Sequence, residues 1–181
     1  ASAHAAGIGG PDLQLVHGQA EKLAADIPQR LVDAADGAGE HDAAGAVPGV
    51  PFGVEVEVDK ETGQVKILKY VAAHDVGRAI NPMLLEGQVY GGATMGIGYA
   101  LTERLILKDG KIMNPNFLDY KMLTAKDVPK IEPLVIETID EFGPFGAKGI
   151  GEPGLVPTAP AIANAIYDAI GVRIKDLPIT P

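Results

Sequence analysis

The stretch that decides the fold is residues 53–70, GVEVEVDKETGQVKILKY. Its valines at 54, 56 and 58 alternate with acidic residues, which places apolar and charged side chains on opposite faces of a β-strand. The tetrapeptide KETG then supplies a turn, and apolar and polar residues alternate again up to Tyr70. This pattern predicts an antiparallel β-hairpin with one face in contact with water.

A glycine-rich helix is expected next. Residues 83–105, MLLEGQVYGGATMGIGYALTERL, follow an Asn-Pro turn and have the length of a helix of roughly twenty residues. Each glycine inside a helix costs about 1 kcal/mol relative to alanine. The five glycines therefore need a reason, either tight helix-to-sheet packing or close approach of a ligand. They are Gly87, Gly91, Gly92, Gly96 and Gly98.

The remaining elements mix strands and helices. RLILKDGKI, residues 104–112, predicts a second hairpin with Asp109-Gly110 at its turn, and residues 131–140 predict another strand. Residues 158–173 predict a final helix with Gly171 at its C-terminal cap. Because strands and helices do not alternate strictly, we expect an α+β fold with a mixed or antiparallel sheet and packed helices.

The first fifty residues differ from the rest. Apolar residues between 13 and 32 indicate one or two amphipathic helical pieces. Small residues dominate from 34 to 53, as is typical of a linker. Residues 1–50 are therefore left unassigned as a partly helical segment and linker, and residues 51–181 form the domain to be interpreted.

Composition narrows the function classes. The 181 residues are 46% apolar, enough to bury one core, and the net charge of −9 argues against a nucleic-acid partner. With no cysteine, this chain forms no disulfide and holds no conventional iron–sulfur cluster. No apolar run of eighteen residues and no signal-peptide pattern occur, so we expect a cytoplasmic protein without a membrane span.

One acid lies in an unusual context. Glu152 belongs to FGPFGAKGIGEPG, residues 142–154, where glycines would let a bulky cofactor or substrate approach it. The start of the final helix favours an anion, whereas burial in an apolar pocket would raise its pKa, and together these influences suit a general base. Two structural roles stay open: Glu152 caps the helix, or it pairs with Lys148 on the surface.

Other constellations are weaker. GPFGAKGIGE lacks the Lys-Ser/Thr pair of a phosphate-binding P-loop. The four histidines have no metal-ligand spacing, so we expect no metal held by protein side chains. His74 and Asp75 are adjacent and could form a hydrogen-bonded pair at a strand end.

The order of four elements carries a family resemblance. D-x-G-x-x-x-N-P begins at residue 75, E-G-Q-x-x-G-G at 86, G-A-K-G-x-G-E-P at 146 and G-V-R-x-x-x-L-P-x-T-P at 171. In this order they resemble the C-terminal part of the molybdenum-binding subunit of the xanthine oxidase family of molybdenum hydroxylases. The resemblance covers residues 51–181 and implies that they are a portion of the C-terminal molybdopterin-binding domain.

The resemblance also implies roles for single residues. Glu152 falls on the family's active-site glutamate, the base that takes a proton from a molybdenum-bound hydroxyl while a hydride leaves the substrate. Gln88 falls on a glutamine expected to hydrogen-bond the pyranopterin, a task that suits an amide because it donates and accepts. Gly92 and Gly151 would permit backbone approach to the cofactor. Lys148 would steady the loop or the anionic part of the cofactor, although a solvated surface lysine fits equally.

Cofactors and partners follow from the same resemblance. The cofactor would be a molybdenum-pterin, in bacterial members molybdopterin cytosine dinucleotide. The 2Fe-2S clusters and possibly FAD would be on partner chains, so the expected partners are the remainder of the molybdenum subunit, an iron–sulfur subunit and possibly a flavin subunit. The substrate would be a small aldehyde or N-heterocycle.

Two alternatives differ in class. Since a full molybdenum subunit is several times longer, we expect this chain to be inactive alone. It could instead be a non-catalytic module that completes a partner's cofactor pocket. It could also be an unrelated structural α+β domain in which Glu152 caps a helix and the glycines serve packing.

Overall fold

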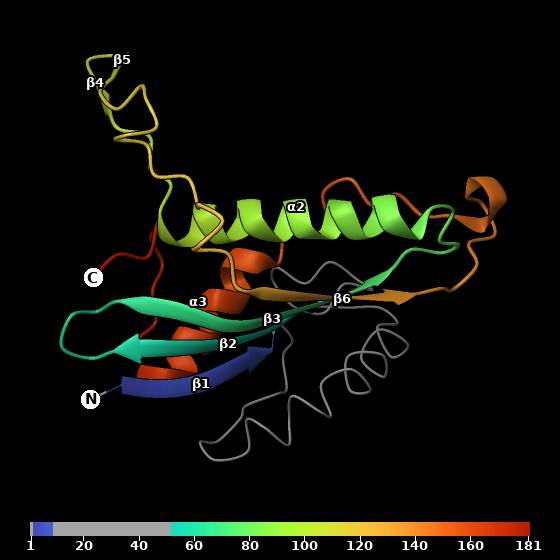
Figure 1. Cartoon of the computed structure of the whole chain (residues 1–181), viewed down its shortest axis with the longest axis horizontal. Helices are drawn as coiled ribbons and strands as arrows, with labels where there is room; N and C mark the ends of the chain where they lie inside the picture. The colour runs from blue at the N-terminus through green and yellow to red at the C-terminus, as the bar shows by residue number, and fades with distance from the viewer. Residues whose placement is uncertain (1, 9–51) are drawn as a thin grey trace.

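A computed structural model of the chain describes residues 2–8 and 52–181 (Figure 1). The four-stranded sheet comprises β1 (Ser2–Ile8), β2 (Phe52–Asp59), β3 (Val65–Asp75) and β6 (Lys130–Ile136), in the order β1-β2-β3-β6. The first three strands pair antiparallel, whereas β6 pairs parallel to β3. The sheet is therefore mixed.

The predicted hairpin is confirmed as β2 and β3. Val54, Val56 and Val58 are buried in the core, while the intervening glutamates are only partly buried. At the turn, Asp59 accepts hydrogen bonds from the Glu61 amide at 2.9 Å and the Thr62 hydroxyl at 2.8 Å. Gly63 has φ of +73°, a conformation that L side chains rarely adopt, so a glycine is required there.

Strand β1 was not anticipated from the sequence. It pairs along its whole length with β2 and forms an edge of the sheet, so residues 2–8 belong structurally with the later domain. The helical pieces expected between residues 13 and 32 and the linker between 34 and 53 lie outside the described residues, apart from the start of β2.

The two long helices are confirmed. Helix α2 (Pro82–Leu101) has Asn81 as its N-cap, whose side chain accepts from the Leu84 amide at 3.1 Å, and it ends four residues before the predicted limit. Helix α3 (Thr158–Ile170) ends at Gly171, which has φ of +73° as expected of a C-cap. Figure 1 shows α3 packed against the sheet and α2 lying alongside it, and α3 contacts β1, β2 and α2.

The core lies between the sheet and these helices. Its largest fully buried members include Phe52 and Tyr70 from the hairpin, Ile97 from α2, and Ile162 and Ile166 from α3. The Tyr70 hydroxyl lies 2.7 Å from the Thr158 hydroxyl, which joins the hairpin to the first turn of α3. Burial raises the pKa of Tyr70 far above its usual range, so its hydroxyl stays protonated.

The predicted second hairpin is present but short. Strands β4 (Leu107–Lys108) and β5 (Lys111–Ile112) pair antiparallel around Asp109-Gly110. Figure 1 shows them in an arm that projects from the body of the molecule. Among the described residues, no helix has the length and apolar character needed to cross a lipid bilayer. Mixed sheet and packed helices together confirm the α+β class.

Candidate functional site

Glu152 lies in the loop that joins β6 to α3, beside helix α2. Its backbone carbonyl accepts from the amides of Leu155 at 2.9 Å and Val156 at 3.4 Å, which folds the chain into the turn before α3. The helix itself begins later, with Pro157 at the N-cap position and no side-chain cap. Glu152 is therefore not the cap of α3.

The side chain of Glu152 is exposed and makes no hydrogen bond or ion pair with another described residue. The surface pair with Lys148 is absent, because Lys148 binds Asp75 instead. The expectation that the carboxylate is held out of water is not met within residues 52–181. Any enclosure of Glu152 needs groups from outside this part of the chain.

Gln88 and Gly151, both predicted to bind a cofactor, contact each other. The Gln88 side-chain Nε2 donates a 2.7 Å hydrogen bond to the Gly151 carbonyl. Gln88 is exposed on α2, and its Oε1 has no hydrogen bond to a described residue. The amide thus fastens the residue next to Glu152 and keeps one acceptor available.

Four of the five glycines of α2 divide into two groups, and the fifth, Gly98, lies against the side chain of Glu103. A Cβ added to Gly92 would lie 2.8 Å from the Gly154 carbonyl carbon, and one added to Gly96 would lie 2.5 Å from the Thr158 Cβ. Packing of α2 on the loop and on α3 therefore requires these two. By contrast, a Cβ on Gly87 or Gly91 would meet nothing within 4 Å.

Gly151 also faces open space, since a Cβ added there would meet nothing within 4 Å. Its carbonyl accepts the hydrogen bond from Gln88. Gly87 and Gly91 on α2 and Gly151 in the loop therefore all leave backbone uncovered by side chains near this hydrogen bond. The structure accordingly gives Gly92 a packing role and leaves Gly151 accessible beside Glu152.

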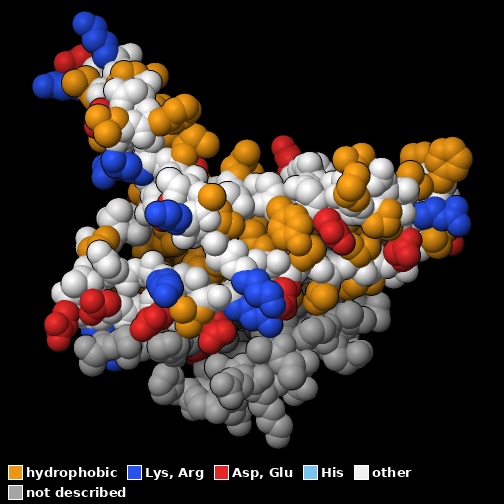
Figure 2. All heavy atoms as spheres, viewed as in Figure 1, with side chains coloured by type: hydrophobic (Ala, Val, Ile, Leu, Met, Phe, Trp, Pro, Cys, Tyr) orange, Lys and Arg blue, Asp and Glu red, His pale blue; other side chains and the backbone are white. Residues whose placement is uncertain are grey.

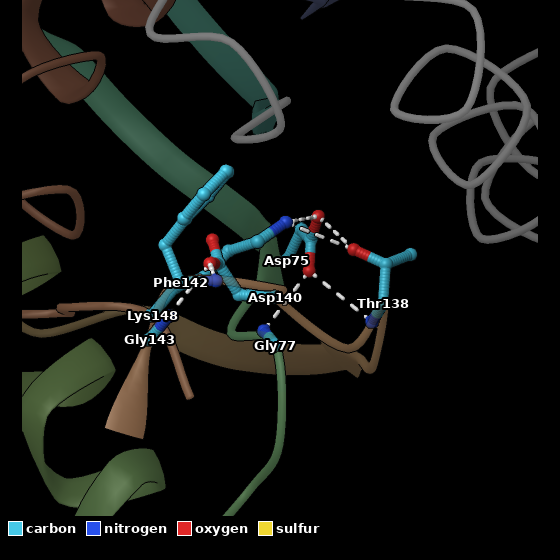
Figure 3. A network of polar contacts seen from close by, with 7 residues as sticks. All are labelled: Asp75, Gly77, Thr138, Asp140, Phe142, Gly143 and Lys148. Carbon is cyan, nitrogen blue, oxygen red and sulfur yellow. Dashed lines mark hydrogen bonds and ion pairs between the residues drawn. The ribbon is translucent and has the colours of Figure 1, made fainter. Parts of the chain in front are cut away.

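Lys148 belongs to a polar cluster at the end of β3 (Figure 3). Its ammonium group pairs with the Asp75 carboxylate and donates to the Thr138 hydroxyl at 2.9 Å. Asp75 also accepts from the Gly77 amide at 3.0 Å. Burial alone would raise the pKa of Asp75, but the hydrogen bonds from Lys148, Thr138 and Gly77 hold it below its usual value.

His74 and Asp75 do not form the hydrogen-bonded pair that the sequence left possible. The Asp75 carboxylate accepts hydrogen bonds from Lys148, Thr138 and Gly77, and neither ring nitrogen of His74 has a hydrogen-bond partner among residues 2–8 and 52–181. His74 is buried, with its ring edge-on to Phe52 at 5.3 Å between centroids. Burial lowers the pKa of His74, and the nearby carbonyls of Pro153 and Ala72 oppose the shift without forming hydrogen bonds of good geometry.

Nothing in the sequence indicated Thr138 or the partners of Asp75. Asp75 opens the D-x-G-x-x-x-N-P element, which was the available signal, but its partner Lys148 is 73 residues away. Within residues 2–8 and 52–181, no group of three or more His, Cys, Asp or Glu side chains is arranged to hold a metal ion.

Comparison with known proteins gives a consistent match. The profile of the molybdopterin cofactor-binding domain family matches residues 19–129, a range that contains Gln88 and Gly92 and ends before Glu152. It begins within the segment that the sequence left unassigned. The putative xanthine dehydrogenase molybdenum-binding subunit of Escherichia coli strain K12 is 45% identical over 130 residues, which are 71% of this chain and 17% of that protein.

Two solved structures share the fold. Quinoline 2-oxidoreductase from Pseudomonas putida 86 has a TM-score of 0.69 at 35% identity, over 73% of this chain and 17% of that one. Aldehyde oxidoreductase from Desulfovibrio gigas has a TM-score of 0.67 at 36% identity, over 73% of this chain and 14% of that one. The chain thus spans less than a fifth of each of these proteins, and the predicted α+β architecture is theirs.

Proposed function

This chain belongs to the molybdopterin cofactor-binding domain family, and from that premise we propose that it supplies the general base, Glu152, to a molybdenum hydroxylase. The single observation that carries the proposal is the hydrogen bond from Gln88 to Gly151, the residue before Glu152. This hydrogen bond brings the Gln88 amide and the Glu152 backbone, 64 positions apart in sequence, close together, and both residues are exposed.

That surface suits an organic cofactor. Gln88 keeps Oε1 as an acceptor for an N–H group, and the backbone at Gly87, Gly91 and Gly151 faces open space without side chains in the way. An uncharged amide and bare backbone can match the mixed donor and acceptor edge of a pterin. Gln88 and Gly151 would therefore hold the cofactor, while Gly92 would keep the loop close to α2.

The bound molybdenum-pterin would supply the two-electron oxidation. Glu152 would accept the proton that a water-derived oxygen loses as it attacks an electron-poor carbon of an aldehyde or N-heterocycle. For this the carboxylate must be ionised and fixed in place. Gln88 on one side and the Leu155 and Val156 amides on the other hold its backbone, which serves that positioning.

The exposed face of α2 has the apolar character expected of a surface that a partner covers. Glu86 is the one charged residue of this helix, and apolar side chains project from its exposed side (Figure 2). They are Met83, Leu84, Tyr90, Met95 and Tyr99. A helix that is apolar all round belongs in an interior, and obligate interfaces resemble a domain core cut in half.

The occupant would be the remainder of a molybdenum-binding subunit, because the chain spans only 17% of the relative from Escherichia coli. That remainder would enclose Glu152 and complete the cofactor site, so the chain alone would be inactive. The cofactor would carry a cytosine dinucleotide. Since the 181 residues contain no cysteine, 2Fe-2S clusters and any FAD would lie on partner chains, in a cytoplasmic complex.

The exposure of Glu152 favours a second candidate, a non-catalytic module that completes a partner's cofactor pocket. Glu152→Gln in the assembled complex separates the two. If Glu152 is the base, kcat of Glu152→Gln should fall about 10²- to 10⁴-fold while the molybdenum and pterin content is retained. A matched control is Glu141→Gln, since Glu141 is an exposed acid of the same β6–α3 connection. Activity near that of the control would favour the module.

A further inference from the structure

We propose that Lys148 and Asp75 are positioning residues for Glu152, because their ion pair fastens the glycine-rich loop to the end of β3. This inference rests on the proposed function of Glu152. It assigns Lys148, which the resemblance linked to the cofactor, a place in the protein scaffold instead.

Asp75 is the centre of the cluster (Figure 3). One carboxylate oxygen accepts from the amides of Gly77 at 3.0 Å and Thr138 at 3.4 Å, and the other receives the Thr138 hydroxyl and the Lys148 ammonium group. Gly77 belongs to the β3–α2 connection, Thr138 lies just after β6, and Lys148 lies in the glycine-rich part of the β6–α3 connection that also contains Glu152. One carboxylate thus joins three segments of the chain.

Lys148 is attached at both of its ends. Its ammonium group binds Asp75 and the Thr138 hydroxyl, and its backbone amide donates to the Val76 carbonyl at 2.9 Å. The side chains of Lys148 and Asp75 are 34% and 15% exposed, so the pair is partly shielded from water and from salt. Such a pair constrains the backbone more than a fully exposed one.

Backbone hydrogen bonds also join the β3–α2 connection to the loop that contains Lys148. Gly77 forms a bridge with Ala147, and the Arg78 amide donates to the Gly146 carbonyl at 2.8 Å. Gly77 has φ of +66°, and a Cβ there would lie 2.3 Å from the Gly146 carbonyl oxygen. The loop therefore lies directly on the β3–α2 connection, and the ion pair holds it there.

The link to Glu152 is short, and its central residue, Ile150, packs against the hydrophobic core. Only Gly149, Ile150 and Gly151 separate it from Lys148, and Cβ atoms on either glycine would meet nothing within 4 Å. Glycine gains more conformational freedom than any other residue when released. The anchor at Lys148, the packing of Ile150 and the hydrogen bond from Gln88 to Gly151 therefore together position the backbone that precedes the carboxylate.

The test uses the assembled complex with three substitutions: Lys148→Met removes the charge, Lys148→Arg keeps it, and Lys60→Met is the control. Lys60 is exposed in the β2–β3 turn and its side chain has no partner among the described residues. In Lys148→Met, hydrogen exchange at the Lys148 and Arg78 amides should accelerate at least about ten-fold. kcat should fall about ten- to a hundred-fold with little change in KM, and Lys148→Arg should recover most of it.

Combining substitutions identifies the route of the effect. If Lys148 acts through Glu152, Lys148→Met should cause little further loss in a Glu152→Gln background, measured in single turnovers at high enzyme concentration. An equal loss in both backgrounds, or unchanged exchange and kcat, overturns the proposal. Should Lys148→Met fail to assemble, Thr138→Val, which removes the bridging hydroxyl, takes its place with the same expected pattern.

The two levels of the proposal fail differently. Full activity of Glu152→Gln refutes the proposed base, whatever the exchange data show. A large effect of Glu152→Gln with no effect of Lys148→Met refutes only the positioning role.

Discussion

Gln88 and Gly151 are joined by a 2.7 Å hydrogen bond, so helix α2 holds the backbone immediately before Glu152. An exposed glutamine on a mostly apolar helix therefore holds this loop in place. It fixes the loop with its Nε2, and in the proposed function its Oε1, which accepts no hydrogen bond from a described residue, would accept one from the cofactor.

Replacing Gln88 with alanine should weaken both functions at once. We expect lower molybdenum and pterin content per complex and, in the loaded fraction, a lower kcat, because the loop loses the hydrogen bond that anchors Gly151, the residue before Glu152. Gln64→Ala is the matched control, since Gln64 is exposed in the β2–β3 turn and its side chain has no partner among the described residues. Equal cofactor content in the two variants would contradict the assignment of Gln88 to the cofactor.

Gly92→Ala should destabilise the protein by about 1–3 kcal/mol, because its Cβ would lie 2.8 Å from the backbone of the buried Gly154. Thermal or denaturant unfolding of the complex measures this loss. Thr94→Ala on the same helix adds no atom and improves helix propensity, so it should be neutral or stabilising. A neutral Gly92→Ala would mean that the loop does not pack on α2 as described.

His74 should make stability depend on pH between about 5 and 7. Burial lowers its pKa in the folded state below about 6.5, the value for an exposed histidine. Below that pH the unfolded chain binds more protons than the folded one, so stability falls as the pH falls. His74→Leu removes the two unpartnered nitrogens and should flatten this part of the profile. An unchanged slope between pH 5 and 7 would contradict a neutral, buried His74.

Asp75 should make stability depend on pH in a more acidic range than His74 does. Its lowered pKa contributes stability that is present above about pH 4 and is lost as the pH falls through the folded-state pKa. Asp75→Asn should reduce the acid-range dependence, to which other carboxylates with lowered pKa values also contribute, while leaving the dependence between pH 5 and 7 intact. Unfolding curves collected from pH 3 to 8 on both variants distinguish the two groups.

The outer face of α2 should not tolerate charge. Leu84 is 66% exposed in this chain, and Leu84→Glu should prevent assembly because it would bury an unpaired carboxylate against the remainder of the subunit. Co-purification of the subunits measures this effect. Lys175→Glu, at an exposed site outside the helix, should assemble normally. Normal assembly of Leu84→Glu would show that this face stays in contact with water.

Local patterns predicted much of the fold. Alternating valines predicted the β2–β3 hairpin, and Gly171 predicted the end of α3. The structure confirms this cap, since Gly171 has φ of +73°, a conformation that favours glycine. Strand β1 escaped prediction because SAHAAGI has little β propensity, and its place depends on pairing with residues about fifty positions away. The parallel pairing of β6 with β3 was likewise hidden, since strand partners are not encoded locally.

The candidate site was predicted only in part, for the same reason. The motifs pointed to Glu152, Gln88 and Gly151, and the structure brings the last two into contact. The partners of charged groups could not be read from neighbours in the sequence. Asp75 pairs with Lys148 across 73 positions, rather than with the adjacent His74.

The most direct test is the rate at which substrate reduces the molybdenum centre in a single turnover of the assembled complex. With Glu152→Gln this rate should fall about 10²- to 10⁴-fold relative to Glu141→Gln, at equal molybdenum and pterin content. If both fully loaded variants are reduced at the same rate, Glu152 is not the base.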